Sequence, residues 1–502
     1  MHMFRRVPIR ALLPAVMGLL FFCPVFITAF NNSLNYYSLP ALALTIFAGL
    51  AVILLLIWGA ACCSKRLFLL LLAGVVLALR LGWILWVDTP PSSDFLTMLD
   101  AAKQAAAGDF SFARTEYFLR WNHQLGFTVY ESLPLALFGQ AVFPLKLLNV
   151  LFSTGTVVLV YLLAARLFGE NSGRAAGLLY GLYPPAILYC SVLTNQHLSM
   201  FLFTLAVYSA LRTSTAFKHW PIIGLCLGAG QLIRPVGPVY LGIFVLIAAL
   251  QIIAGWRNHG FNLSRLWPPL KRVAGVLIIF IAVGQLWSYS WSILGAADRP
   301  LGDREPYWKV MAGLNPQTTG AWSADDDAYA RSYPLGEERD RAELSKIGER
   351  LEDKAGLLHL LGAKFDHMWG VQDSATYWSL TGTRQAGLDI PLTRIERVFY
   401  LLASGLGCFG CIRLALRARR DQKQEHAALV EVETSQSLGF PLLALLLLGY
   451  AGIHLLIEVQ PRYRLDMLPL FFVFSGLGLS TLAYTRRKTR TPSHQGQVEA
   501  GM

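Results

Sequence analysis

Long runs of apolar residues, separated by short polar connections, set the pattern of this chain. A helix needs about 20 apolar residues to cross a bilayer, and about twelve runs in the sequence approach that length. Each run is expected to be helical, because a backbone surrounded by lipid has to satisfy its own hydrogen bonds. The predicted spans are 11–30, 41–61, 67–87, 144–167, 174–193, 197–212, 220–234, 236–255, 273–293, 396–416, 439–458 and 465–485.

Basic residues in the polar connections predict how the spans are oriented. Arg5 precedes the first span, Lys65 lies between the second and third, and Arg486 follows the last. Connections rich in Lys and Arg stay in the cytoplasm, and the basic connections alternate onto one face, so both termini are predicted to be cytoplasmic. The opposite, external face carries two long segments, 88–143 and 294–395, whose aromatic and amphipathic stretches predict interfacial helices.

Composition agrees with a membrane protein and narrows the functional classes. Of 502 residues, 55% are hydrophobic and 15% are charged, with 43 Lys and Arg against 31 Asp and Glu. This positive excess does not indicate nucleic-acid binding, because the basic residues lie in the connections and form no stripe with aromatics. The seven cysteines are scattered, with none in the external segments. The sequence has no phosphate-binding loop, dinucleotide fingerprint or zinc-protease motif, which disfavours nucleotide-driven chemistry.

Asp94 is the candidate catalytic residue. It ends the polar run 88–94, about six residues beyond a predicted span, and begins the first external segment. A carboxylate held at the membrane surface suits a base that acts on a membrane-borne substrate. Because the stretch after it has helical spacing, a purely structural alternative is that Asp94 is the N-cap of a helix.

Three arginines depart from the rule that external connections are poor in basic residues. Arg462 and Arg464 lie in the last external turn, and Arg234 lies at the external tip of a span broken by prolines. A guanidinium close to lipid requires an anionic partner, and its planar fork suits phosphate. The alternative is an internal ion pair of Arg462 or Arg464 with Glu458 or Asp466.

The second external segment adds polar residues of less specific meaning. Asn315 lies in a run of turn-forming residues, and Asp325, Asp326 and Asp327 follow it. Adjacent carboxylates can bind a divalent cation, but this spacing matches no calcium loop, so a solvated turn at a helix start is predicted instead. The charged stretch 337–354 predicts a soluble helix.

A series of short motifs on the predicted external face resembles a known family. The motifs lie at Asp94, 121–126, 183–189, 194–197, 232–235, 313–322 and 458–463. In this order they resemble the bacterial members of the dolichyl-phosphate-mannose protein mannosyltransferase superfamily, including the aminoarabinose transferases of lipid A. The resemblance extends over 67–485.

The resemblance implies an all-α polytopic membrane protein of the GT-C type. The membrane catalytic domain would be 67–485, preceded by two extra helices in 1–66 and followed by a basic cytoplasmic tail, 486–502. Such an enzyme transfers a hexosyl or pentosyl group, with inversion, from a polyprenyl-phosphate donor to an extracytoplasmic hydroxyl, in the plasma membrane of a bacterium. The acceptor class stays open between a lipid, a cell-wall polymer and a protein.

The resemblance also implies roles for individual residues. Asp94 would be the general base. The donor phosphate would be bound by Arg234, Arg462, Arg464 and Tyr463. The acceptor or sugar pocket would include Trp121, Asn122, His123 and Asn315.

One departure from the family lies in the turn 194–197. Family members commonly have an acidic residue there, whereas this chain has Asn195, Gln196 and His197. No cofactor is therefore predicted, and a divalent cation stays open. Two other functional classes also stay open: a lipid-linked glycan polymerase or ligase, and a membrane transporter or flippase. The two long external segments favour an enzyme over a transporter.

Overall fold

The computed structural model describes residues 9–212, 220–259, 263–298, 300–302, 304–424 and 434–488. Every regular element in these ranges is a helix, which confirms the predicted all-α class. Arg5 and most of the predicted basic tail, from residue 489 onward, lie outside the described residues.

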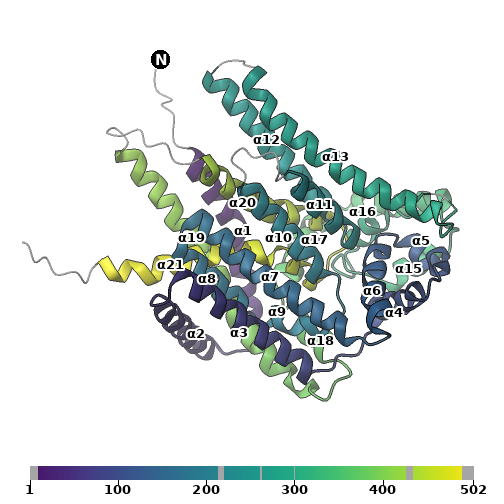
Figure 1. The fold of residues 1–502 in the computed structure, drawn as a ribbon, viewed down its shortest axis with the longest axis horizontal. Coiled ribbons are helices and arrows are strands. Elements are labelled where there is room, and N and C mark those ends of the chain that lie inside the picture. Colours follow the sequence, from purple (N-terminus) through teal and green to yellow (C-terminus); the bar gives the residue numbers. More distant parts are fainter. Residues whose placement is uncertain are drawn as a thin grey trace, which may run out of the picture.

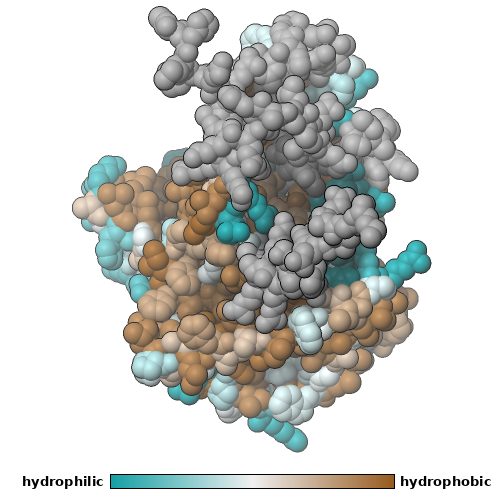
Figure 2. Space-filling model, turned by 90° about the vertical axis from the view of Figure 1, so that its left-hand side faces the viewer, coloured by the Kyte–Doolittle hydropathy of each residue, from teal (hydrophilic) through white to brown (hydrophobic). Residues whose placement is uncertain are grey.

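Eight helices in the described ranges are long and apolar enough to cross a membrane, so the chain is a multi-pass membrane protein. Hydrophobic side chains cover much of the face shown in Figure 2. These helices are α1 (Ile9–Ser33), α2 (Leu39–Ala60), α3 (Lys65–Trp86), α7 (Phe143–Phe168), α13 (Leu263–Ile293), α19 (Asp389–Gln424), α20 (Thr434–Leu456) and α21 (Leu468–Lys488).

The other predicted spans correspond to helices outside this set of eight, so the predicted number of spans is not confirmed. The prediction of one helix across 174–193 is corrected, because α8 ends at Gly181 and the chain restarts at Pro184. Proline lacks an amide hydrogen and forces the preceding residue, here the extended Tyr183, out of the helical region. The elements are α8 (Glu170–Gly181), α9 (Pro184–Leu188), η2 (Tyr189–Ser191), α10 (Gln196–Arg212), α11 (Trp220–Ile233) and α12 (Gly237–His259).

Helix α21 is the centre of the membrane bundle and packs against α7, α8 and α19. Small residues allow this close approach. A Cβ atom at Gly478 would lie 1.9 Å from the carbonyl oxygen of Leu406, and one at Gly476 would lie 2.6 Å from the side chain of Ala176. Glycine at these contacts lets helix backbones meet closely, where packing is the main attraction between helices in lipid.

Short helices from both predicted external segments gather at one end of the bundle. Figure 1 shows α4, α5, α6, α15 and α16 together at its right-hand end. The helix predicted at 337–354 is present as α16, which ends at Glu352. The short elements are α4 (Ser93–Ala106), η1 (Ser111–Arg114), α5 (Glu116–Arg120), α6 (Gln124–Phe138), α14 (Trp308–Gly313), α15 (Ala324–Arg331), α16 (Glu337–Glu352), α17 (Lys354–Phe365), η4 (Asp366–Gly370), α18 (Ala375–Leu380), η5 (Ala386–Leu388) and η6 (Pro461–Met467).

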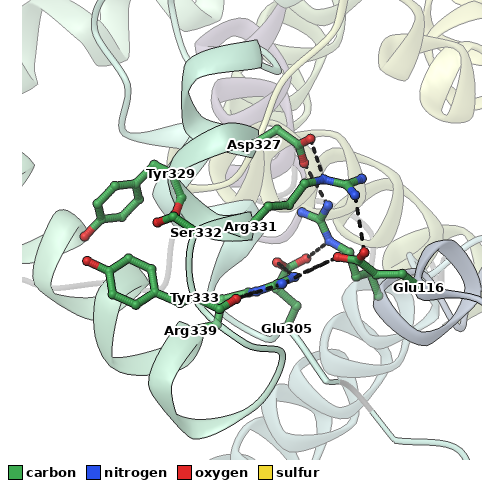
Figure 3. A network of polar contacts seen from close by, with 9 residues as sticks. Glu116, Glu305, Asp327, Tyr329, Arg331, Ser332, Tyr333 and Arg339 are labelled. Atoms are coloured by element: carbon green, nitrogen blue, oxygen red, sulfur yellow. Dashed lines mark hydrogen bonds and ion pairs between the residues drawn. The ribbon is translucent and has the colours of Figure 1, made fainter.

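A network of ion pairs joins the two external segments (Figure 3). Arg339 of α16 donates to Glu305 at 3.1 Å and to Glu116 of α5 at 3.4 Å. Arg331 of α15 donates to Asp327 and also reaches Glu116. We call this network the external joint; its members are Glu116, Arg120, Glu305, Asp327, Arg331 and Arg339.

Glu343 lies beside the external joint and makes stability sensitive to pH. Burial, and then the neighbouring charge of Glu305, raise the pKa of Glu343 to about 8. The folded protein therefore holds a proton that the unfolded chain releases near pH 4.5, so this group lowers stability as pH rises from about 4.5 to 8. The maximal slope is about 1.4 kcal/mol per pH unit.

We therefore predict that Glu343→Gln lessens the loss of stability between pH 5 and 8. The measurement is the Tm of the detergent-solubilised protein across that pH range. Glu338→Gln, an exposed change in the same helix, is the matched control. An identical fall in Tm for the unmodified protein and Glu343→Gln would contradict the prediction.

Candidate active site

Asp94 lies in the first turn of α4 with its side chain exposed. The N-cap of this helix is Ser92, so the alternative that Asp94 is the N-cap is wrong. The positive helix terminus favours a negative charge at this position. Ser93, just before Asp94, has φ +53°, a left-handed conformation that is rare for a residue with a side chain. Such local strain is often found beside functional groups.

The side chain of Asp94 borders the same site as Arg462. The hydroxyl of Tyr117, from α5, is buried near both residues. Burial, and then the negative charge of Asp94, raise the pKa of Tyr117, while the positive charge of Arg462 opposes this rise. The guanidinium of Arg462 also lies 5.1 Å from the ring centre of Phe95, the residue after Asp94. The first external segment and the last external turn therefore meet at this point.

Arg462 has donor capacity left for a ligand. Its Nε donates to Gln460 at 2.8 Å, and its guanidinium packs against the Trp378 ring at 4.7 Å from the centre. The side chain is half-buried. Within the described residues no carboxylate lies within ion-pair distance of Arg462. An anion at this position would supply the missing partner.

Arg234 and Arg462 both lie close to the ring of Tyr463. The ring centre of Tyr463 is 4.9 Å from the guanidinium of Arg234 and 5.9 Å from that of Arg462. Arg234 donates through Nε to Asp466 at 2.6 Å and through a terminal nitrogen to Asn195 at 3.4 Å. The structure thus brings together three of the predicted phosphate ligands.

Lys309 completes this cationic cluster and was not predicted from the sequence. It pairs with the buried carboxylate of Glu458, and its Nζ lies 5.2 Å from the ring centre of Trp121. Burial alone would lower the pKa of Lys309, but Glu458 outweighs burial and raises it to about 12. Lys309 is therefore charged at neutral pH. Because Glu458 also accepts a hydrogen bond from Tyr463, Lys309 is linked through Glu458 to the ring that both arginines approach.

His123 is the uncharged member of the site. Burial, and then the positive charges of Lys309 and Arg234, lower its pKa to about 3. The imidazole is therefore neutral at physiological pH and can donate or accept a hydrogen bond. Trp121 and Asn122, the other predicted pocket residues of this segment, are half-buried in the connection between α5 and α6.

The neutral turn at 194–197 supports the arginines. Asn195 accepts from Arg234 and donates to the carbonyl of Ile233 at 3.2 Å. Gln196 donates to the carbonyl of Arg462 at 2.9 Å. His197 is buried, and within the described residues neither of its ring nitrogens has a hydrogen-bond partner. Where the family commonly has an acid, this chain therefore has two amides that hold the cationic cluster.

Arg464 is placed away from the cluster. It is fully buried, donates to Glu396 at 3.0 Å and stacks on Tyr400 at 4.2 Å from the ring centre. The predicted alternative, an ion pair of Arg462 or Arg464 with Glu458 or Asp466, is wrong. Long-range partners, Lys309 and Arg234, occupy those two carboxylates instead.

Asn315 is part of a different cavity. Its side chain donates to Asp326 at 2.9 Å and accepts from the backbone of Gln317 at 2.9 Å, so it holds a turn. The cavity has a volume of about 440 Å³ and lies between this turn and α15–α17. The predicted solvated turn at 325–327 is corrected: Asp326 is buried against Arg350, and the three acids occupy the first turn of α15. The described residues contain no cluster of three or more His, Cys, Asp or Glu arranged to bind a metal.

The Lys309–Glu458 pair yields a prediction on stability. Lys309→Met leaves the Glu458 carboxylate buried without its cation, and we expect a loss on the order of 3 kcal/mol. The double variant Lys309→Met/Glu458→Gln removes the uncompensated charge and should recover most of that loss. Thermal unfolding of the purified variants in detergent measures both effects. Equal Tm values for the single and double variants would contradict this account.

The fold and the site define a multi-pass membrane protein with a carboxylate, a neutral histidine and three cations at one end of its helix bundle. Residues 127–287 match the model of the family described as dolichyl-phosphate-mannose-protein mannosyltransferase. This match confirms the predicted resemblance over that part of the chain, which is less than half of its length. Arg234 lies inside the matched residues, whereas Asp94, Lys309 and Arg462 lie outside them.

Two solved membrane-protein structures are similar to the chain at low identity. One is the archaeal oligosaccharyltransferase AglB from Archaeoglobus fulgidus, in complex with an inhibitory peptide and a dolichol-phosphate (14% identity, TM-score 0.40, 86% of this chain). The chain spans about half the length of that protein, 52%. The other is ArnT from Cupriavidus metallidurans bound to undecaprenyl phosphate (13% identity, TM-score 0.36, 82% of this chain and 77% of that one). No curated protein matches the chain.

Proposed function

We propose that the protein is an integral-membrane glycosyltransferase that moves a sugar from a polyprenyl-phosphate donor to an acceptor hydroxyl. The observation that carries this proposal is that half-buried Arg462 packs against Phe95, the residue after exposed Asp94. Within the described residues Arg462 has no carboxylate partner. A base and an anion site side by side suit a displacement in which a phosphate leaves. The family match at 127–287 supports the same class of reaction.

The proposed reaction is a single displacement. Asp94 accepts the proton of the acceptor hydroxyl while that oxygen forms a bond to the anomeric carbon. The bond from the anomeric carbon to the phosphate oxygen breaks, and the electron pair leaves with polyprenyl phosphate. Arg462, Arg234 and Lys309 offset the charge that develops on the phosphate. Attack opposite the leaving group inverts the anomeric configuration.

We also propose the membrane side on which this reaction occurs. The basic connections of the chain alternate onto one face, so this face is cytoplasmic and carries both termini. The site then lies on the extracytoplasmic face, and the membrane is the plasma membrane of a bacterium. The acceptor is a hydroxyl group of a lipid, a cell-wall polymer or a protein, and the pocket lining rather than the fold selects among them.

Donor choice tests the proposed function. The protein, reconstituted in lipid vesicles, is supplied with polyprenyl-monophosphate sugars and, separately, with polyprenyl-diphosphate oligosaccharides. We expect the release of free polyprenyl phosphate from a monophosphate donor when an acceptor is present. Turnover of a diphosphate donor alone would instead assign the protein to the lipid-linked glycan polymerases or ligases.

A further inference from the structure

Gln460 lies between Glu458 and Arg462 in the last external turn and bonds both side chains. Its Nε2 donates to the carboxylate of Glu458 at 2.9 Å, and its Oε1 accepts from the Nε of Arg462 at 2.8 Å. An ionised carboxylate only accepts hydrogen bonds, and a guanidinium only donates them. The two neighbours therefore fix which end of the Gln460 amide faces which side chain.

The backbone around Gln460 holds its side chain in this place. Gln460 precedes Pro461, which disfavours a helical conformation, and it is extended, with φ −139° and ψ 148°. The backbone N–H of nearby Glu458 donates to the carbonyl of Lys309 at 2.7 Å. The carboxylate of Glu458 also pairs with the ammonium group of Lys309. The Gln460 amide therefore connects an acid that is anchored twice to the second external segment with Arg462.

This amide binds Arg462 without neutralising it, because glutamine carries no charge. The guanidinium is also packed against the rings of Phe95 and Trp378, at 5.1 and 4.7 Å from their centres. In the described part of the chain, the two terminal nitrogens of Arg462 make no hydrogen bond. They can bond two oxygens of one phosphate group. Because Gln460 lies between them, Arg462 does not pair with Glu458.

We propose that Gln460 is a positioning residue for Arg462. Its neutral amide orients the guanidinium toward the donor phosphate and separates it from the carboxylate of Glu458. An acid at position 460 would hold the guanidinium but would also neutralise it, and an apolar side chain would leave it able to pair with Glu458. This inference rests on the proposed function, because it takes the phosphate of a polyprenyl-phosphate donor as the anion that Arg462 binds.

The variant Gln460→Glu tests the inference with almost no change in shape. The measurement is the affinity of the protein, purified in lipid nanodiscs, for polyprenyl phosphate. We expect this affinity to fall about 10-fold, the usual contribution of a charge-assisted hydrogen bond. Polyprenol, which has the lipid tail but lacks the phosphate, should bind the variant and the unmodified protein equally. Gln317→Glu, the same change at an exposed glutamine of the second external segment, is the matched control and should leave both affinities unchanged.

A second variant, Gln460→Met, separates positioning from a loss of folded protein. It removes both hydrogen bonds of the amide and adds no charge, so polyprenyl phosphate should again bind about 10-fold more weakly. In an Arg462→Met background the same change should have no further effect, because the group that Gln460 positions is gone. A merely structural loss would weaken the binding of polyprenyl phosphate and polyprenol alike, in both backgrounds. Tm values are compared for every variant.

The outcomes are distinct. An unchanged affinity of Gln460→Glu for polyprenyl phosphate would overturn the positioning role. So would an equal loss of affinity from Gln460→Met in the unmodified protein and in the Arg462→Met variant, or no binding of polyprenyl phosphate by the unmodified protein. Binding of polyprenyl phosphate without sugar transfer from any monophosphate donor would instead contradict the proposed function alone.

Discussion

Asp94→Asn is expected to lower the rate of sugar transfer by about 10²- to 10⁴-fold, the usual contribution of a positioned general base. Asparagine has nearly the shape of aspartate but does not accept a proton at neutral pH. Because the Asp94 side chain is exposed, the change leaves no buried group unpaired and the protein should fold and insert normally. The measurement is the initial rate of transfer from a polyprenyl-phosphate sugar at saturating donor.

The matched control for this variant is Asp100→Asn. Asp100 is also exposed and lies in the same helix, where it pairs with Lys103 at 2.9 Å. This control should transfer sugar at the wild-type rate. Wild-type transfer by Asp94→Asn, in a protein with an unchanged Tm, would remove Asp94 from the mechanism.

Arg462→Met is expected to have the second large effect, a loss of about 10²- to 10³-fold in kcat. Methionine keeps an apolar side chain against the Phe95 and Trp378 rings that now pack on the guanidinium. No carboxylate in the described part of the chain loses an ion pair. The loss therefore reports the missing charge at the departing phosphate. Steady-state kinetics with a polyprenyl-phosphate donor, with kcat and KM determined separately, measure it.

Two other variants sharpen this prediction. Arg462→Lys restores a point charge without the planar fork, so it should recover part of the rate. Arg384→Met removes an exposed arginine from the second external segment and should leave the rate unchanged. Equal kinetics for Arg462→Met and Arg384→Met would show that Arg462 does not act on the donor.

The apolar pattern predicted the helical class because lipid imposes one local rule, the internal satisfaction of backbone hydrogen bonds. The prediction failed where a stronger local rule intervened. The run 174–193 is largely apolar, but Pro184 and Pro185 end one helix and begin another inside it. The hydropathy of a segment takes no account of the amide hydrogen that proline lacks.

The site residues that could be predicted from the sequence are those that stand out from their immediate neighbours in the chain. Asp94, Arg234 and Arg462 are charges in places where a membrane protein has few, and this is visible in the sequence. Lys309 is one of several basic residues in a polar segment, and its partner Glu458 lies 149 positions away. Only the folded chain brings such a pair together.

The position of Arg464 shows the same limit of prediction from the sequence. It is as unusual in the sequence as Arg462, two positions earlier, yet it points into the bundle and bonds Glu396 of α19. In the 3-10 helix η6, two residues separate side chains onto different faces. The sequence therefore shows that the turn is charged, but it does not show which of the two arginines faces the ligand.

The anomeric configuration of the product tests the central claim most directly. A polyprenyl-phosphate sugar of known configuration is converted by the reconstituted protein, and the configuration of the transferred sugar is determined by NMR before it can equilibrate. The account predicts inversion, because Asp94 deprotonates the acceptor while the phosphate departs from the opposite face. Retention would contradict it, since a retained configuration requires a second displacement through a nucleophile on the enzyme.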